Sequence, residues 1–133
     1  MPLFSLRNHC EFDPHYSLKI HDDGCVAYAY LYESEDIVGD VWLYNQQEPP
    51  LTSFWLPEDV PFLNPKEYLT DNAAIKPVTD KSQVRCEWTE SKDTGLIEAA
   101  IYIRDKFIAS LAVGDKPGWS VLVCKDGPLA LKY

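Results

Sequence analysis

The first 44 residues alternate apolar and polar positions in short runs separated by polar turns. Residues 16–21 alternate Tyr, Leu and Ile with Ser, Lys and His, which is the period of a half-buried β-strand. The segment Asp22-Asp23-Gly24 is typical of a turn, because glycine adopts positive φ at little cost. Residues 25–32 and 37–44 predict two further strands, with a polar loop at residues 33–36 between them. The pattern therefore predicts a three-stranded meander over residues 1–44.

Residues 45–82 break this pattern and form a proline-rich crossover. Its prolines exclude regular structure over most of residues 45–65. The same stretch also carries many apolar side chains, which predict an ordered loop packed on the domain: Leu51, Phe54, Trp55, Leu56, Phe62 and Leu63. Asn64 followed by Pro65 and Glu67 is typical of a helix start, with Asn64 as the cap and Pro65 at the first helical position.

Alternation returns in residues 83–133 as a second meander. Strands are predicted at residues 83–89, 96–104, 107–113 and 119–124, and Gly127-Pro128 suggests one terminal helical turn. The predicted fold class is therefore mainly β, that is, an α+β fold with little helix. About seven antiparallel strands in two meanders form one curved sheet or a two-layer sandwich. Each half alone is marginal in size, so we expect one domain spanning residues 1–133.

The net charge of −9 is distributed unevenly along the chain. Residues 1–60 contain eleven acids and only two bases, Arg7 and Lys19, whereas residues 61–133 contain ten of each. Binding to nucleic acid or to an anionic membrane surface would need the opposite sign, so neither is expected. A basic protein partner fits this charge distribution better.

The expected location is the cytoplasm. Residues 1–7 show no secretory signal pattern, and no apolar run reaches the about 20 residues of a membrane span. Four cysteines stand far apart with no Cys-x-x-Cys pair, which favours reduced and mostly buried thiols.

No motif indicates catalysis, a metal or a cofactor, so none is expected and an enzyme is disfavoured. His9, His15 and His21 lie within thirteen residues, but their spacing matches no metal pattern and favours surface histidines. Cys86 lies between Arg85 and Glu87 on a predicted strand, so its side chain points away from both and a buried structural thiol is expected. Ser120 lacks the second glycine of a nucleophile elbow. The clustered acids sit in turns, where solvated carboxylates are common.

Aromatic residues concentrate in the hairpin formed by residues 25–44. One register places five rings on a single face beside Asp40: Tyr28, Tyr30, Tyr32, Trp42 and Tyr44. Tyr and Trp are enriched at interface hot spots, yet large aromatic side chains usually bury. Because sequence does not fix the register, the face is either an interface or an inner face covered by Trp55 and Phe62.

Three strings in the chain resemble those of a group of small bacterial proteins with no assigned activity. These strings are residues 40–45, 61–65 and 114–119 with 125–130. In general character, being small, acidic and free of catalytic motifs, the chain also resembles bacterial toxin-immunity proteins of the contact-dependent inhibition type. The resemblance implies a protein-binding role and assigns no residue.

The sequence thus favours an acidic domain that docks a basic partner, such as an immunity protein that neutralises a nuclease toxin. The alternative is a small-ligand or metal-binding protein, or an enzyme, with its pocket under the proline-rich crossover. A homodimer stays open as well. The residues expected to contact the partner are Asp22, Asp23, Glu33, Glu35, Asp36, Asp40 and Trp42.

Overall fold

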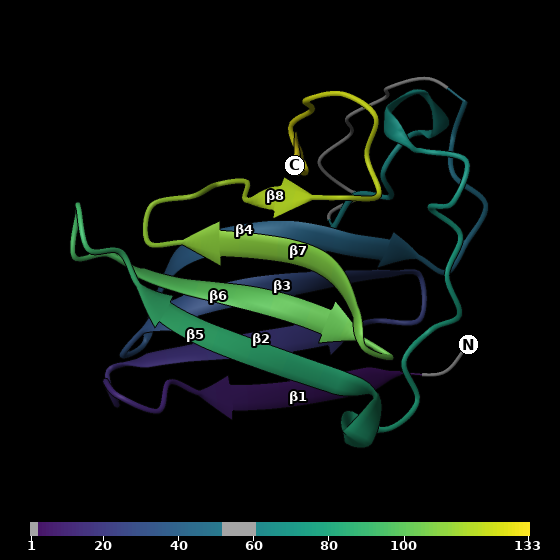
Figure 1. The fold of residues 1–133 in the computed structure, drawn as a ribbon. Coiled ribbons are helices and arrows are strands. Elements are labelled where there is room, and N and C mark those ends of the chain that lie inside the picture. Colours follow the sequence, from purple (N-terminus) through teal and green to yellow (C-terminus); the bar gives the residue numbers. More distant parts are fainter. Residues whose placement is uncertain (1–2, 52–60) are drawn as a thin grey trace.

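The computed structural model describes residues 3–51 and 61–133, and it places their strands in two sheets (Figure 1). The first sheet contains, in this order, β1 (Phe4–His9), β2 (Tyr16–Asp22), β3 (Val26–Glu33) and β4 (Asp36–Asn45). The second contains β5 (Val84–Glu90), β6 (Ile97–Ile103), β7 (Lys106–Ala112), β8 (Trp119–Ser120) and β9 (Leu131–Lys132). All neighbouring strands are antiparallel except β8 and β9, which are parallel.

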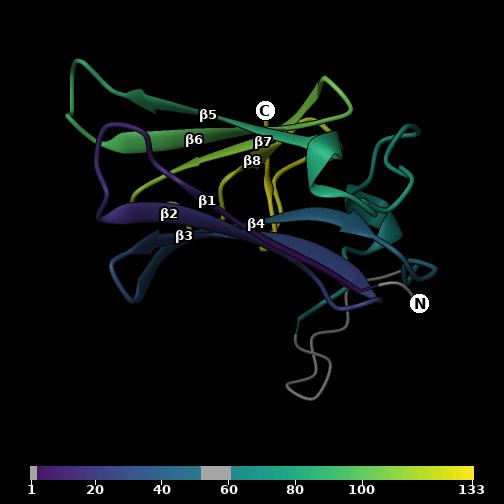
Figure 2. The ribbon, with the colours of Figure 1, turned by 90° about the horizontal axis from the view of Figure 1, so that it is seen from below.

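The two sheets lie face to face as two layers (Figure 2). Each sheet comes from one end of the chain, and the crossover joins them. The mainly β class and the two meanders predicted from the sequence are therefore confirmed, and the arrangement is two-layered.

Several local predictions differ from the structure. β1 and β9 were not expected, and the strand predicted at residues 119–124 is only two residues long. The helix predicted after Asn64 is a single 3-10 turn, η2 (Lys66–Tyr68), with Pro65 rather than Asn64 at the cap and no side-chain cap. A second such turn, η3 (Lys81–Gln83), precedes β5, and the predicted helical turn at Gly127 does not form.

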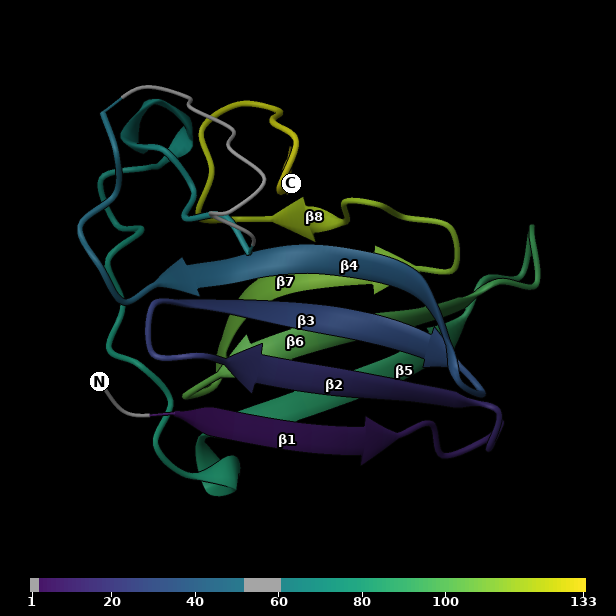
Figure 3. The same cartoon turned by 180° about the vertical axis from the view of Figure 1, so that it is seen from behind.

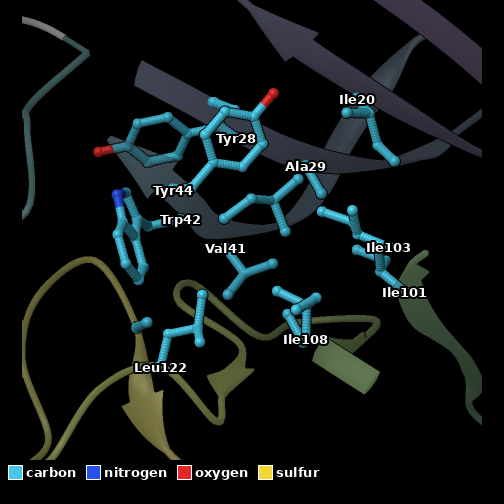
Figure 4. Close-up of a cluster of buried hydrophobic side chains, with 14 of the residues drawn as sticks. Ile20, Tyr28, Ala29, Val41, Trp42, Tyr44, Ile101, Ile103, Ile108 and Leu122 are labelled. Carbon is cyan, nitrogen blue, oxygen red and sulfur yellow. The ribbon is translucent and has the colours of Figure 1, made fainter. Parts of the chain in front are cut away.

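The core lies between the layers and draws on both halves of the chain. Ile20, Ala29 and Val41 are register partners across β2, β3 and β4, and all three are buried. Ile101 and Leu111 of the second sheet belong to the same cluster (Figure 4). Burying one such aliphatic side chain is worth about 1.5–3 kcal/mol, so this inner row is a main source of stability.

The two sheets approach most closely where β4 passes β7. A Cβ atom at Gly39 would lie 3.2 Å from the carbonyl oxygens of both Ala112 and Asp115. Glycine at this position therefore lets the two backbones meet without an intervening side chain.

Backbone hydrogen bonds from the C-terminal part of the chain cover the outer edge of β4. The Gly114 amide donates to the Val38 carbonyl at 2.7 Å, and the Trp42 amide donates to the Leu129 carbonyl at 3.0 Å. Between these two bonds, the backbone amide of Asp40 donates to the Asp115 carbonyl, and the backbone carbonyl of Asp40 accepts from the Gly118 amide. Figure 3 shows β4 beside this yellow-green segment. The β4 edge of the first sheet is thus bonded rather than open to another chain.

The described part of the crossover packs only in places. Phe62 and Leu63 are half-buried, whereas Leu51 is exposed. Phe54, Trp55 and Leu56 lie outside the described residues, so the expectation that Trp55 covers the aromatic face stays a prediction. Among the described residues, no helix has the length and apolar character needed to span a membrane.

Candidate partner-binding surface

Two of the residues expected to contact a partner are buried, and for them the expectation is wrong. Asp22 and Trp42 both have 0 % exposure. Asp22 ends β2 on the inner face of the sheet, where its carboxylate accepts hydrogen bonds from the side chains of Tyr44 and Gln46 at 2.7 Å each. The Trp42 indole N–H donates to Oδ1 of Asn45 at 2.9 Å. Both side chains therefore hold the fold together.

The remaining expected acids do not form one group along the hairpins. Asp23 lies in the β2–β3 turn, where its Oδ1 accepts from the amides of Cys25 and Val26 at 2.8 and 3.0 Å. Glu33, Glu35 and Asp36 lie at the β3–β4 turn, at the opposite end of the first sheet. Asp23 is thus a turn-forming residue, separated from the other carboxylates by the length of the sheet.

A coherent group does form at one end of the first sheet, and we call it the acidic end. Antiparallel pairing brings the β1–β2 and β3–β4 turns together, and the Ser34 amide donates to the His15 carbonyl at 2.6 Å between them. The group includes two acids that the sequence did not single out. Its members are Glu11, Asp13, Glu33, Glu35 and Asp36.

Charges next to the acidic end compensate it only in part. Nδ1 of His15 lies 3.0 Å from Oδ1 of Asp13, and the Tyr16 hydroxyl donates to Oε2 of Glu33 at 3.3 Å. The β5–β6 turn and the β7–β8 loop of the second sheet reach the same end, as Figure 1 shows. Within the described ranges these two segments contribute Lys92 and Lys116, but also Glu90, Asp93 and Asp115. The end therefore stays net negative.

Within the acidic end, Asp13 is suited to remain ionised. The backbone amide of His15 donates to the Asp13 carboxylate and lowers the pKa of that group. Burial, followed by the neighbouring Glu33, raises the pKa of Tyr16. At neutral pH Asp13 is thus a carboxylate and Tyr16 a neutral phenol.

Two apolar side chains stand exposed among these acids. Phe12 is 52 % exposed in the β1–β2 turn, and Ile37 is 42 % exposed beside Asp36. An exposed aromatic ring surrounded by charges resembles the anchor and rim of a protein interface. Sequence alternation could have suggested Phe12, because it interrupts a polar turn.

The aromatic face is split by a β-bulge at Leu43. Tyr28 pairs with Trp42, but Tyr44 pairs with Ala27, so Tyr44 points to the inner face. Tyr44 therefore does not join the other rings, because the extra residue reverses the alternation. Tyr30 and Tyr32 are half-buried on the outer face, and Arg7 stacks on Tyr32 with its guanidinium carbon 4.6 Å from the ring centroid.

A cavity of about 210 Å³ opens on the outer face of β3 and β4, and we call it the aromatic pocket. Tyr28 and Tyr30 stack at 6.1 Å with an interplanar angle of 15°. Asp40 is the register partner of Tyr30 and is one of the pocket's charged groups. The pocket is lined by Tyr28, Tyr30, Asp40, Pro61, Phe62, Pro128 and Leu129.

The surroundings of Asp40 in this pocket change the pKa of its carboxyl group. Burial raises the pKa of the Asp40 carboxyl, while the positive charge of Lys116 opposes part of that rise. Burial also raises the pKa values of Tyr28 and Tyr30, and the Tyr28 hydroxyl donates to the Phe62 carbonyl at 2.6 Å. A desolvated acid beside two neutral rings is a site that a cation would stabilise.

The three histidines are not gathered by the fold. His9 pairs with Ser17 and His21 pairs with Ser5, four ladder positions or about 13 Å apart on the sheet. His15 lies beyond them in the turn. In residues 3–51 and 61–133, no three His, Cys, Asp or Glu side chains are grouped so that they could hold a metal ion.

The candidate nucleophiles occupy structural positions. Burial raises the pKa of the Cys86 thiol to about 11, so little thiolate exists at neutral pH. Ser120 is fully buried, and its hydroxyl accepts from the Leu122 amide at 3.1 Å.

A second cavity of about 280 Å³ lies within the crossover, between residues 45–49 and 69–77. Its walls combine amide side chains with apolar ones and include Asn45, Gln46, Gln47, Leu69, Ile75 and Pro77. Gln46 already donates to Asp22, and Asn45 exchanges hydrogen bonds with the Asn64 backbone.

The chain was compared with protein families, curated proteins and solved structures. No protein-family model, no curated protein and no solved structure matches the chain. The function is therefore argued from the surface itself.

Proposed function

We propose that this chain is an acidic protein-binding domain that docks a basic partner through the acidic end. The observation that carries the proposal is the convergence of two turns that places five carboxylates around exposed Phe12 and Ile37. Complementary charge raises the association rate, and a desolvated apolar anchor slows dissociation. The surface thus combines two features that a protein interface uses.

The partner class that fits best is a nuclease toxin, with this chain acting as its immunity protein. Nuclease surfaces are basic because they hold phosphates, so an acidic surface competes for the same region. The character of the chain, small, acidic and free of catalytic motifs, supports the same class. Binding there would block the substrate without any chemistry by this chain.

The test measures binding of the purified chain to a panel of basic nuclease toxin domains, beginning with any encoded beside its gene. Association should slow steeply as salt rises. Replacing Glu33, Glu35 and Asp36 together by Gln, Gln and Asn should lower the association rate about 10-fold at low salt. Phe12→Ala should instead speed dissociation.

The matched control removes the same charge away from the acidic end. The variant D71N/D105N/D126N neutralises three exposed carboxylates elsewhere and should bind almost as the wild type does. Two outcomes would overturn the proposal: an equal loss of association rate in both triple variants, or the absence of any panel member that binds with a Kd below about 10 μM.

The cavity within the crossover favours a second candidate function, the binding of a small polar ligand. At about 280 Å³ it is close to the lower limit of small-molecule sites. Screening a metabolite library by thermal shift, with Ile75→Trp as the filled-cavity variant, tests it. A compound that raises the melting temperature of the wild type but not of the Ile75→Trp variant supports this function. A screen that finds no such compound rejects it.

A further inference from the structure

The aromatic pocket lies apart from the acidic end, on the outer face of the first sheet. Its carboxylate comes from the middle of β4, whereas the acidic end begins at Asp36 on the same strand. Since β4 rises about 3.3 Å per residue, the two sites are about 13 Å apart. One partner of ordinary size covers both.

The pocket has the size of one side chain. A volume of about 210 Å³ is below the about 300–1,000 Å³ of sites for small molecules. Its walls come from β3 and β4, from Pro61 and Phe62 of the crossover, and from Pro128 and Leu129. The Tyr28 hydroxyl donates to the Phe62 carbonyl, and the Leu129 carbonyl accepts from the Trp42 amide, so these bonds tie both loop segments to the first sheet and lower the cost of ordering them on binding.

The chemistry of the walls selects an organic cation. The flat faces of Tyr28 and Tyr30 offer negative quadrupole potential, and Asp40 offers a half-buried carboxylate. Lys19 is the β2 partner of Tyr30, and Lys116 is close enough to influence Asp40. Neither lysine is within 4.0 Å of the Asp40 carboxylate, so no ion pair within residues 3–51 and 61–133 satisfies that group.

Among organic cations, the guanidinium group fits this arrangement best. It is planar, stacks on aromatic rings and can form two parallel hydrogen bonds with a carboxylate. An ammonium group is compact and more strongly hydrated, so it gains less from a stacked ring.

We propose that the aromatic pocket receives one arginine side chain of the basic partner, which stacks on Tyr30 and pairs with Asp40. This inference rests on the proposed function for the source of the arginine. Arginine is among the residues that dominate interface energetics, and a buried pair of this kind fixes the orientation of a complex that long-range charge attracts.

The experiment is a ¹H–¹⁵N NMR titration of the full chain with Nα-acetyl-arginine-N-methylamide at constant ionic strength. The neutral isostere is the corresponding citrulline compound, and the lysine compound tests the choice of cation. We expect saturable shifts centred on Tyr30, Asp40 and Leu129, with at least 5-fold weaker binding of citrulline and lysine compounds. Equal binding of the lysine compound, or shifts that are absent or spread over all acids, would overturn the inference.

Two variants localise the effect. Asp40→Asn and Tyr30→Leu should each lower the affinity for the arginine compound at least 5-fold, and Glu35→Gln at the acidic end should leave it unchanged. Arginine binding that survives Asp40→Asn would overturn the assignment.

The two proposals fail in different ways. If no basic protein binds but the arginine compound does, the proposed function is wrong, while the assignment of the pocket as an arginine site stands. If a basic protein binds and Asp40→Asn leaves its dissociation rate unchanged, the pocket assignment is wrong while the proposed function stands.

Discussion

The Tyr44 hydroxyl donates a 2.7 Å hydrogen bond to Oδ2 of Asp22, although the two residues lie on strands that do not neighbour each other. β3 separates them, and the small side chain of Ala27 between them leaves room for the contact. The same hydroxyl accepts from the Val78 amide at 3.0 Å. One buried phenol thus joins β2, β4 and the crossover.

Tyr44→Phe should therefore destabilise the protein by about 2–3 kcal/mol. The substitution leaves the Val78 N–H without its acceptor and removes one donor from a buried carboxylate, and unsatisfied buried groups carry their full desolvation penalty. Urea unfolding measures the change. Tyr16→Phe is the control, because its 3.3 Å bond to Glu33 is partly exposed and should be worth below about 1 kcal/mol. Similar losses in both variants would contradict the assigned network.

Asp40→Asn should make the free protein more stable at pH 7. Burial raises the pKa of Asp40 in the folded state above its unfolded value of about 3.9, so ionisation opposes folding. The free-energy penalty of burying the ionised carboxyl is complete at pH values above the folded-state pKa. It disappears once the pH falls below the unfolded-state pKa. The stability difference between variant and wild type should accordingly shrink as pH drops toward 3, as thermal unfolding across pH would measure. A variant less stable than wild type at pH 7 would refute the expected direction.

The four cysteines should differ in reactivity according to exposure and pKa. Cys124 is exposed, whereas Cys10 is buried and Cys86 has a pKa of about 11. Iodoacetamide at pH 8 should label Cys124 first and Cys86 at least 10-fold more slowly, since thiolate is the reacting form. The labelling rate of Cys86 should keep rising up to about pH 11. Peptide mass spectrometry with time points checks both trends, and rapid Cys86 labelling in the folded protein would show that the thiol is accessible.

Asn45→Ala should loosen the crossover from the first sheet. The Asn45 side chain accepts from the Trp42 indole and the Asn64 amide and donates to the Asn64 carbonyl, each at 2.9 Å. Removing it leaves three partners unsatisfied and should cost about 2–4 kcal/mol. Hydrogen exchange would show lost protection at Asn64. Asn8→Ala, which breaks one bond to the Trp88 indole at 2.7 Å, is the control and should leave Asn64 protected.

Strand positions were predictable because their signal is local. Residues 16–21, 25–32 and 37–44 alternate in a way that only a half-buried sheet satisfies, and the observed strands differ there by about one residue at each end. β8 and β9 are only two residues long, and β9 joins the sheet by parallel pairing with β8, so neither segment is long enough to show a periodic pattern. The 3-10 turn at Lys66–Tyr68 reflects a bond from the Lys66 amide to the Pro50 carbonyl, a contact that no local motif encodes.

The site was predictable only in part, because charge is visible in a sequence and facing direction is not. Asp22 and Asp23 are adjacent acids in a turn, yet one is buried and the other bonds its own backbone. Trp42 and Tyr44 are separated by a bulge, which places them in different surroundings. Glu11, Asp13 and Phe12 joined the surface through the pairing of two turns, which register alone decides.

The bonds along β4 also bear on the order in which the molecule assembles. Backbone groups of Val38, Asp40 and Trp42 on the outer edge of β4 bond to residues 114–129, which leave the ribosome after the first sheet. Until then a nascent first sheet carries an unpaired edge that can recruit a second nascent chain. Slow translation of the second half should therefore favour aggregation of the first.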